Sequence, residues 1–280
     1  MGTHAYLEQT ERFARIKDWK TKKVILAIDY TDEDFYGNVQ GFDIHGWTGE
    51  HGVKGKFKFL TCSIVSDEVS EKIPLLSIPI KIGHYKSQVI FYLLSLVKPL
   101  FDEIDLILFD RGFYDKDLMY ELKKANYRYL IFVPKQPDKQ EILYGLENND
   151  HIAINNEFTI NKDKTNYHDE NYLVFLKNIF CRKTEECYDW VFATNVENVA
   201  FGDIITTYKK RWSIETGFRV QDEATIKCKS KDLQTRYFLF LFTQLLQSDW
   251  MCFYKDEVSF KKFLIELDAF GQRITKSTIS

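Results

Sequence analysis

Two short, largely apolar runs in the sequence each lead directly into an aspartate. Val24–Ile28 precedes Asp29, and Asp105–Phe109 precedes Asp110. Runs of this kind are typical of central strands that are covered on both faces. In an open α/β sheet, ligands gather where loops leave the strand ends. If the two strands are neighbours, both carboxylates lie at one place, whereas either one alone is equally explained by a turn or a helix cap.

A third carboxylate lies on a segment with helical spacing, residues 204–223. Winding this segment as a helix places aromatic, basic and acidic side chains within an arc of about 120°; they are Tyr208, Arg211, Trp212, Glu215, Phe218, Arg219 and Asp222. One interpretation is a solvated helix in which Arg211 and Glu215 form an i,i+4 ion pair. The other is a helix that brings Glu215 to a metal site and basic side chains to a phosphate.

The coincidence of Asp29, Asp110 and Glu215 favours the metal site. Three converging carboxylates without a cation would repel one another and raise one another's pKa. Mg²⁺ removes this conflict, because hard cations take oxygen ligands and leave positions for water and a substrate phosphate. Two such ions, about 3.5–4 Å apart, can activate a water or a 3′-hydroxyl and stabilise the leaving oxygen in phosphoryl transfer.

Composition indicates a packed chain with a local basic track. The 280 residues are 45% hydrophobic and 16% aromatic, which is ample for a core. A net charge of −3 argues against non-specific coating of nucleic acid. Between Tyr208 and Arg236, however, eight basic residues outnumber four acids. The basic residues are Lys209, Lys210, Arg211, Arg219, Lys227, Lys229, Lys231 and Arg236, and this local excess suits phosphate.

Other features exclude several classes of protein. The five cysteines show no C-x-x-C spacing and indicate reduced thiols in a cytosolic protein. The late apolar segment 237–254 is interrupted by polar residues, so we expect a buried helix and no membrane partner. The sequence has no Gly-rich phosphate loop of either common type. We therefore expect no nucleotide cofactor, and a small-molecule α/β enzyme is disfavoured.

The order of the expected elements indicates an α/β fold interrupted by an insertion. Residues 1–23 are expected to form a basic N-terminal arm, and residues 24–133 alternate strands and helices as the first part of a core. Residues 134–188 are polar with short alternating pieces, which predicts a β-rich insertion. The alternation resumes in residues 189–280, the second part of the core, which ends in two helices.

Three motifs carry a resemblance to a known family. Asp29 ends one strand, Asp110-Arg111-Gly112-Phe113 follows a second, and Thr194-Asn195 precedes Tyr208-x-x-Arg211-Trp212-x-Ile-Glu215. Together they resemble the DDE transposases of bacterial and archaeal insertion sequences, and within them the branch with a Tyr-x-x-Arg-x-x-x-Glu-x-x-x-x-x-x-Lys signature. The likeness runs from about Val24 to Trp250. The combination of the Asp-Arg-Gly-Phe and Tyr-x-x-Arg-Trp-x-Ile-Glu motifs is specific for this family, whereas either motif alone is only moderately specific.

The resemblance implies an RNase H-like mixed sheet flanked by helices, with the insertion between the second aspartate and the glutamate. It implies that Asp29, Asp110 and Glu215 hold two Mg²⁺ ions, with Mn²⁺ as a substitute. The reaction would be nicking at the element ends, followed by attack of the freed 3′-hydroxyl on target DNA. Because two ends are cleaved together, we expect a homodimer on DNA, in the cytoplasm and associated with the nucleoid when bound.

The basic track and the resemblance also predict the DNA contacts. Tyr208 and Arg211 would bind the backbone near the cleaved end. The full expected set is Tyr208, Arg211, Arg219, Lys227, Lys229, Trp190 and Arg111. Trp190 could stack on a displaced base, a contact worth about 1–3 kcal/mol, or it could pack in the core. Arg111 could bind phosphate or pair with a carboxylate.

Two departures leave alternatives open. The signature's lysine falls at Asp222, a charge reversal that Arg219 or the lysines beyond it could compensate. Only a short stretch precedes Asp29, where relatives carry a separate DNA-binding region. One alternative is therefore a truncated or inactive remnant that binds DNA without catalysis. Another is a related metal-dependent endonuclease with water as its only nucleophile, which joined DNA products would exclude.

Overall fold

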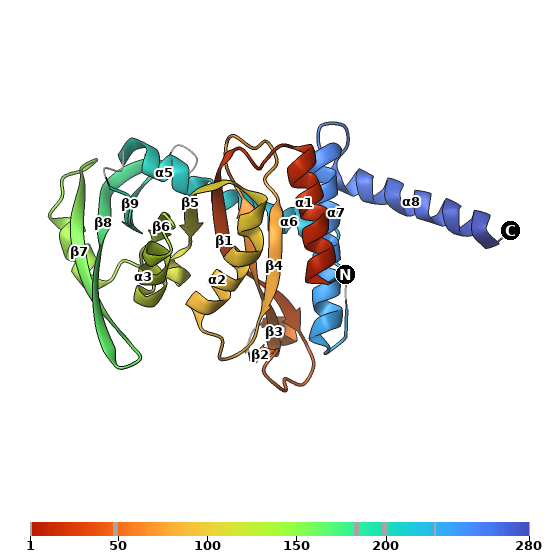
Figure 1. The fold of residues 1–280 in the computed structure, drawn as a ribbon, viewed down its shortest axis with the longest axis horizontal. Helices are drawn as coiled ribbons and strands as arrows, with labels where there is room; N and C mark the ends of the chain where they lie inside the picture. The colour runs from red at the N-terminus through yellow and green to blue at the C-terminus, as the bar shows by residue number, and fades with distance from the viewer. Residues whose placement is uncertain (1, 47–49, 182–184, 198–200, 227, 280) are drawn as a thin grey trace.

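The computed structural model describes residues 2–46, 50–181, 185–197, 201–226 and 228–279. Within these ranges nine strands form one mixed sheet in the order β2-β3-β1-β5-β6-β9-β8-β7, with β4 paired to β3 (Figure 1). The strands are β1 (Lys23–Phe35), β2 (His45–Gly46), β3 (Gly55–Ile64), β4 (Pro74–Ile80), β5 (Glu103–Phe109), β6 (Tyr129–Phe132), β7 (His151–Lys162), β8 (Thr165–Cys181) and β9 (Glu186–Thr194). The helices are α1 (Thr3–Ile16), α2 (Lys86–Val97), α3 (Lys116–Lys124), α4 (Pro137–Tyr144), α5 (Phe201–Lys209), α6 (Trp212–Asp222), α7 (Leu233–Phe253) and α8 (Phe260–Ile279). The predicted α/β fold, a mixed sheet flanked by helices, is confirmed.

The parallel pairing of β1 with β5 positions the two aspartates. The last pair in this ladder is Ile28 with Phe109. The predicted end of the first strand at Asp29 is wrong: β1 continues to Phe35, because β3 pairs with it antiparallel along that length. Asp29 therefore lies within a strand, at the point where its pairing with β5 stops.

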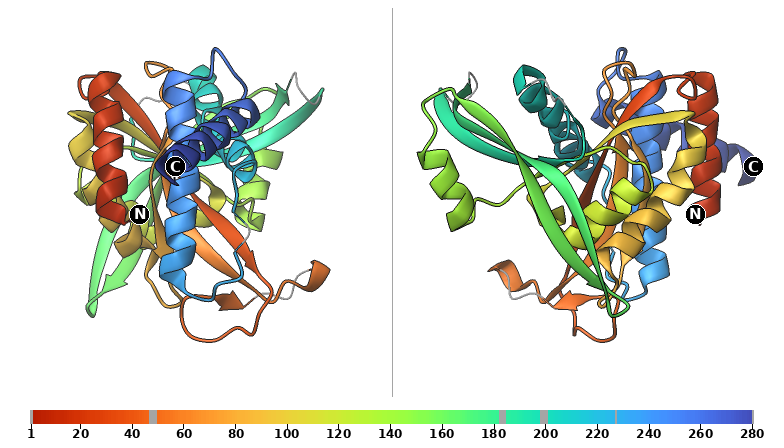
Figure 2. Two further views of the ribbon diagram at one scale, coloured as in Figure 1. Left: turned by 90° about the vertical axis from the view of Figure 1, so that its right-hand side faces the viewer. Right: turned by 60° about the vertical axis from the view of Figure 1, so that its left-hand side comes forward.

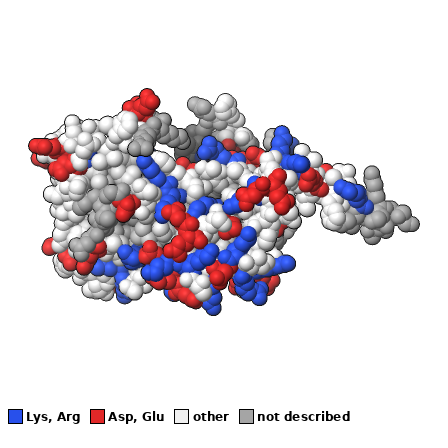
Figure 3. Space-filling view, turned by 90° about the horizontal axis from the view of Figure 1, so that it is seen from above, with Lys and Arg blue, Asp and Glu red and all other residues white. Residues whose placement is uncertain are grey.

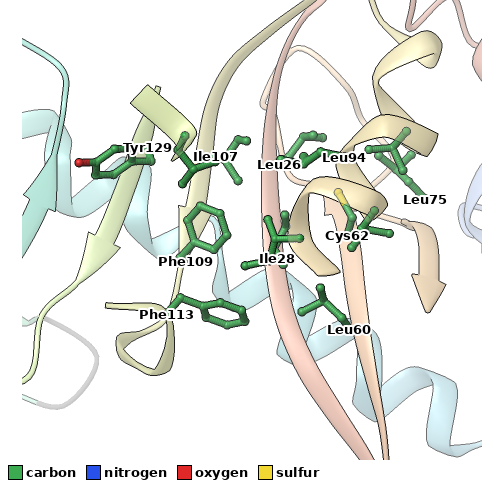
Figure 4. Packing of buried hydrophobic residues seen from close by; sticks show 14 of the residues in the cluster. Leu26, Ile28, Leu60, Cys62, Leu75, Leu94, Ile107, Phe109, Phe113 and Tyr129 are labelled. Atoms are coloured by element: carbon green, nitrogen blue, oxygen red, sulfur yellow. The ribbon is translucent and has the colours of Figure 1, made fainter. Parts of the chain in front are cut away.

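The larger core lies between the sheet and helices α1, α2 and α3. Leu26 and Ile28 of β1 face this side, next to Phe109 of β5 and Leu94 of α2 (Figure 4). Because successive side chains of a strand point to opposite faces, Ala27 faces the other side, where it packs in a second cluster with residues of α5.

The region expected as an insertion is β-rich and includes the short helix α4. Its long hairpin, β7 and β8, pairs from His151 with Leu176 to Lys162 with Thr165. β8 in turn pairs with β9, and β9 with β6. The hairpin therefore lengthens the central sheet at one edge (Figure 2), where β7 contacts α3 and β8 contacts α4.

The expected continuous helix over residues 204–223 is wrong. α5 ends at Lys209 and α6 begins at Trp212. Between them, the backbone N–H groups of Lys210 and Arg211 donate to carbonyls three residues earlier. Such i→i−3 bonds tighten the chain, so the segment is two helices with Arg211 at their junction.

The chain's N-terminal segment belongs to the body of the protein. α1 packs on β4 and α7, and Tyr6, Phe13 and Trp19 are buried in the larger core. The expected basic N-terminal arm, residues 1–23, thus contains the helix α1. α8, by contrast, projects away from the body (Figure 1), and Phe260 in its first turn packs on Trp250 of α7.

The late apolar segment forms the expected buried helix, α7. Its buried face includes Gln244, Gln247 and Ser248 beside apolar residues. Within the described ranges, none of the helices is long and apolar enough to cross a membrane.

Candidate active site

Asp29 and Asp110 lie side by side because β1 and β5 are parallel neighbours. Both directly follow the last pair of the ladder, and the backbone of Asp110 is still extended. In extended chains, side chains two residues apart share a face. Ala27 and Leu108, two residues earlier, pack on the α5 side of the sheet. The two carboxylates follow them onto that side, beneath the junction of α5 and α6.

Arg211 at this junction joins all three carboxylates predicted from the sequence. Its Nη1 lies 2.7 Å from Asp29 Oδ2, and its Nη2 lies 2.7 Å from Glu215 Oε1 and 3.9 Å from Asp110 Oδ1. The expected i,i+4 pair with Glu215 is therefore present, but it is part of a larger cluster. The interpretation of Glu215 as a metal ligand and of the basic side chains as phosphate ligands stays a prediction.

The members of the cluster differ strongly in exposure. The Arg211 side chain is 6% exposed and that of Asp29 17%, whereas Glu215 is 54% exposed. Burial raises the pKa of Asp29 to about 6, and the neighbouring carboxylates of Asp110 and Glu215 add to the rise against the opposing effect of Arg211. The site thus holds more negative charge than its single guanidinium balances.

The hydroxyl group of Tyr208 bonds to two members of the cluster. Its hydroxyl accepts a 3.2 Å hydrogen bond from Arg211 Nε and lies 3.4 Å from Asp110 Oδ1, to which it donates. Its ring is fully buried against Phe192 and Phe132. Burial raises the pKa of Tyr208, so it stays a neutral donor. The predicted phosphate ligands Tyr208 and Arg211 therefore contact the carboxylates in this structure.

The cluster has the chemistry of a divalent cation site. Three carboxylates supply the hard oxygen ligands that Mg²⁺ and Mn²⁺ prefer. Among the described residues, no group of three His, Cys, Asp or Glu side chains is arranged to hold an ion.

The remaining residues of the expected DNA-binding set differ in their position relative to this cluster and in their exposure. Arg111 directly follows Asp110, and Arg219 lies one turn beyond Glu215; both are exposed. Trp190 of β9 packs on Phe192 and contacts the half-exposed ring of Trp212. The last two residues of the expected set are Lys229, which is exposed, and Lys227, which falls outside the described residues.

A cavity beside the cluster was not predicted from the sequence. It has a volume of about 560 Å³ and lies between the second half of β1, the end of α6 and α7. Its walls include Asp32, Asp34, Asp222 and Lys229. Asp32 and Asp34 lie within β1. The strand continues past them to Phe35, which is buried.

Charge on the surface is mixed. Seen from above, lysines, arginines and acids interleave across the middle of the molecule (Figure 3). This pattern agrees with the net charge of −3. On this face, contacts with phosphate would come from individual cations and not from a broad basic surface.

The fold and the cluster define an α/β protein with a triad of carboxylates, assembled from two parallel strands and a helix. The chain belongs to the family of transposase DDE domains, since the family model described as "Transposase DDE domain" matches residues 20–244. This range contains Asp29, Asp110 and Glu215, and the resemblance drawn from the motifs is confirmed for the family. The narrower assignment to the Tyr-Arg-Glu-Lys branch stays a prediction.

A solved transposase structure has a similar fold at low sequence identity. The piggyBac transposase, in a synaptic complex with hairpin DNA, has a TM-score of 0.59 and 13% identity over 88% of this chain and 52% of that chain. This chain thus spans about half the length of that transposase. The NurA nuclease from Sulfolobus solfataricus (TM-score 0.33, 10% identity, 74% of this chain and 79% of that chain) and endonuclease V from Bacillus subtilis (0.29, 13%, 89% and 94%) are too distant to carry an argument. No curated protein matches the chain.

Proposed function

We propose that this chain is the catalytic part of a DNA transposase. It nicks DNA at the ends of an insertion sequence and joins the freed 3′-hydroxyl to target DNA, and so acts in the cytoplasm at the nucleoid. The observation that carries this proposal is the convergence of Asp29, Asp110 and Glu215 on one guanidinium in a chain of the transposase DDE family.

The proposed cofactors are two Mg²⁺ ions, replaceable by Mn²⁺. DDE transposases generally use divalent metal ions. Asp29, Asp110 and Glu215 would hold them, because carboxylate oxygens suit hard cations. When bound, the ions lower the pKa of the attacking water or hydroxyl and stabilise the leaving oxygen.

The other residues of the site bind and orient the DNA. Tyr208 and Arg211 present an O–H and a planar fork of N–H donors, which can hold a phosphate in two places at once. Arg111, Arg219 and Lys229 are exposed cations that contact the backbone on either side. The Lys227 side chain is assigned the same role from the sequence alone.

Trp190 and Trp212 form an aromatic pair near the cluster, with ring centroids 6.5 Å apart. Lys209 lies over the Trp212 ring, with Nζ 6.0 Å from its centroid. A base displaced from the cleaved end can stack on such a platform, a contact worth about 1–3 kcal/mol. Trp190 is the proposed platform, since it also packs on Phe192 and is held in one orientation.

A cleavage assay tests the proposal. Purified protein is incubated with Mn²⁺ and a supercoiled plasmid that carries the DNA flanking its own coding sequence. We expect nicks at the element ends and products joined to a second plasmid. Asp110→Asn should produce neither, whereas Asp105→Asn, which alters a surface pair with Arg128, should act like wild type. Nicks without joined products would support the endonuclease alternative.

A remnant that binds DNA without catalysis is the second candidate. The observation that favours it is Asp222, which stands where the family signature has lysine and lines the cavity beside the cluster. This alternative predicts DNA binding that survives Asp110→Asn, with no nicking by wild type in either metal. Measuring DNA binding by fluorescence anisotropy beside the cleavage assay separates the two.

We also propose a homodimer on DNA, with α8 as the contact surface. α8 projects from the body, and its apolar side chains Leu267 and Phe270 are 42% and 57% exposed. Glu266 and Arg273, seven residues apart, flank these positions. In an antiparallel pair of α8 helices, Glu266 of each copy would face Arg273 of the other copy. This self-complementary charge favours a second copy over DNA as the partner.

A further inference from the structure

Both oxygens of Asp29 already have partners within the chain. Its Oδ1 accepts a 2.8 Å hydrogen bond from the backbone N–H of Tyr30, and its Oδ2 lies 2.7 Å from Arg211 Nη1. Glu215 Oε1 accepts a hydrogen bond from the other end of the same guanidinium. An ion that binds Asp29 through Oδ2, or Glu215 through Oε1, therefore competes with Arg211 for that oxygen.

Arg211 is itself held firmly in this position. Its Nε donates to Tyr208 Oη at 3.2 Å, and its guanidinium carbon lies 5.5 Å from the centre of the Tyr208 ring. The residue is 5% exposed. A buried guanidinium that lost its carboxylates would be strongly destabilising. Arg211 can leave them only if another anion takes their place.

Arg211 lies at the junction between α5 and α6, and it belongs to neither helix: α5 ends at Lys209 and α6 begins at Trp212. The backbone N–H groups of Arg211 and Ile214 donate to carbonyls three residues earlier, in the short turn that joins the helices. Because a guanidinium fork matches phosphate as well as carboxylate, a DNA phosphate at the site offers the replacement anion.

We propose that Arg211 is an internal counter-ion of the triad that a divalent ion must displace, and that the displaced guanidinium binds a DNA phosphate. This proposal rests on the proposed function and adds its regulation. The ion then binds weakly to the protein alone and more tightly when DNA is present. Metal binding and DNA binding are thereby coupled, and the site is assembled only on its substrate.

The test is the affinity of the full chain for Mn²⁺ in the absence of DNA, measured by calorimetric titration. Arg211→Gln removes the competing cation, so we expect Mn²⁺ to bind about tenfold or more tightly than to wild type, within the range of typical site–site coupling. Lys210→Gln removes a neighbouring cation that pairs with Asp67, and it should leave the Mn²⁺ affinity near that of wild type. If Arg211→Gln does not fold, Arg211→Lys serves instead, because one ammonium cannot bridge Asp29 and Glu215, and its Mn²⁺ affinity should also rise.

The outcomes separate this inference from the proposed function. If wild type cleaves DNA but the Arg211 variants bind Mn²⁺ no more tightly than Lys210→Gln, Arg211 is not a competing counter-ion and the inference is overturned. If wild type neither cleaves DNA nor binds Mn²⁺ with DNA present, and Arg211→Gln also binds none, the result contradicts the proposed function itself. Tighter Mn²⁺ binding confined to the Arg211 variants supports the inference independently of activity.

Discussion

Arg211 Nη1 lies 2.7 Å from Asp29 Oδ2, although 182 residues separate them in the sequence. This contact links the middle of β1 to the junction between α5 and α6. It closes a cluster in which one guanidinium serves three carboxylates. The predictions below test what each member of this cluster contributes.

Asp29 should make the protein more stable in mild acid than at neutral pH. Burial raises its folded pKa to about 6, from an ordinary value of 3.8. The folded state therefore binds the proton more tightly, and this group destabilises the fold as the pH rises from about 4 to about 6. The effect is up to about 3 kcal/mol. Urea denaturation of wild type without divalent ions should show it, and Asp29→Asn should lose it. An equal pH dependence in both proteins would show that Asp29 ionises normally.

Glu215→Gln should separate stability from catalysis. The Glu215 side chain is 54% exposed, so losing its pair with Arg211 should change the free energy of unfolding by less than about 1 kcal/mol. Loss of a metal ligand should nevertheless slow DNA nicking about a thousandfold, equivalent to several kcal/mol in the barrier. Thermal melting and the plasmid assay measure the two effects. Glu223→Gln, an exposed carboxylate just beyond α6, is the matched control. Full nicking by Glu215→Gln would remove this residue from the site.

Tyr208→Phe should weaken the support of the guanidinium without changing the packing of the ring. The Arg211 Nε would lose its acceptor, and a buried donor left without a partner costs about 1–3 kcal/mol. We expect a lower midpoint of denaturation and slower nicking. Tyr36→Phe, which alters a ring that is 60% exposed, should leave both unchanged. An unaltered midpoint in Tyr208→Phe would show that Arg211 does not depend on the hydroxyl.

Phe270→Glu should prevent the proposed pairing of two α8 helices. The substitution places a charge in the centre of an apolar contact, where an unpaired charge is strongly unfavourable. Sedimentation of wild type with end DNA should show two protomers, and the variant should show one. Lys261→Glu, an exposed position in the first turn of α8, should still give two. A dimer that persists in Phe270→Glu would place the interface elsewhere.

The sequence alone identified the three carboxylates, because each lies in a recognisable local sequence pattern. Asp29 and Asp110 follow β-prone runs, and Glu215 lies at helical spacing from Arg211 and Tyr208. These patterns depend on neighbouring residues and on fixed periodicities, which can be read without the fold. The same local signals predicted the α/β class.

Only the tertiary structure decided what these residues touch. That β1 continues through Asp29 depends on β3, which pairs with it from a distant part of the chain. The break between α5 and α6 and the position of Arg211 among the carboxylates depend on packing against the sheet. The sequence indicated a basic side chain for phosphate, and the fold placed that side chain on the carboxylates instead. Such contacts follow from long-range pairing and burial, which no local pattern of residue types encodes.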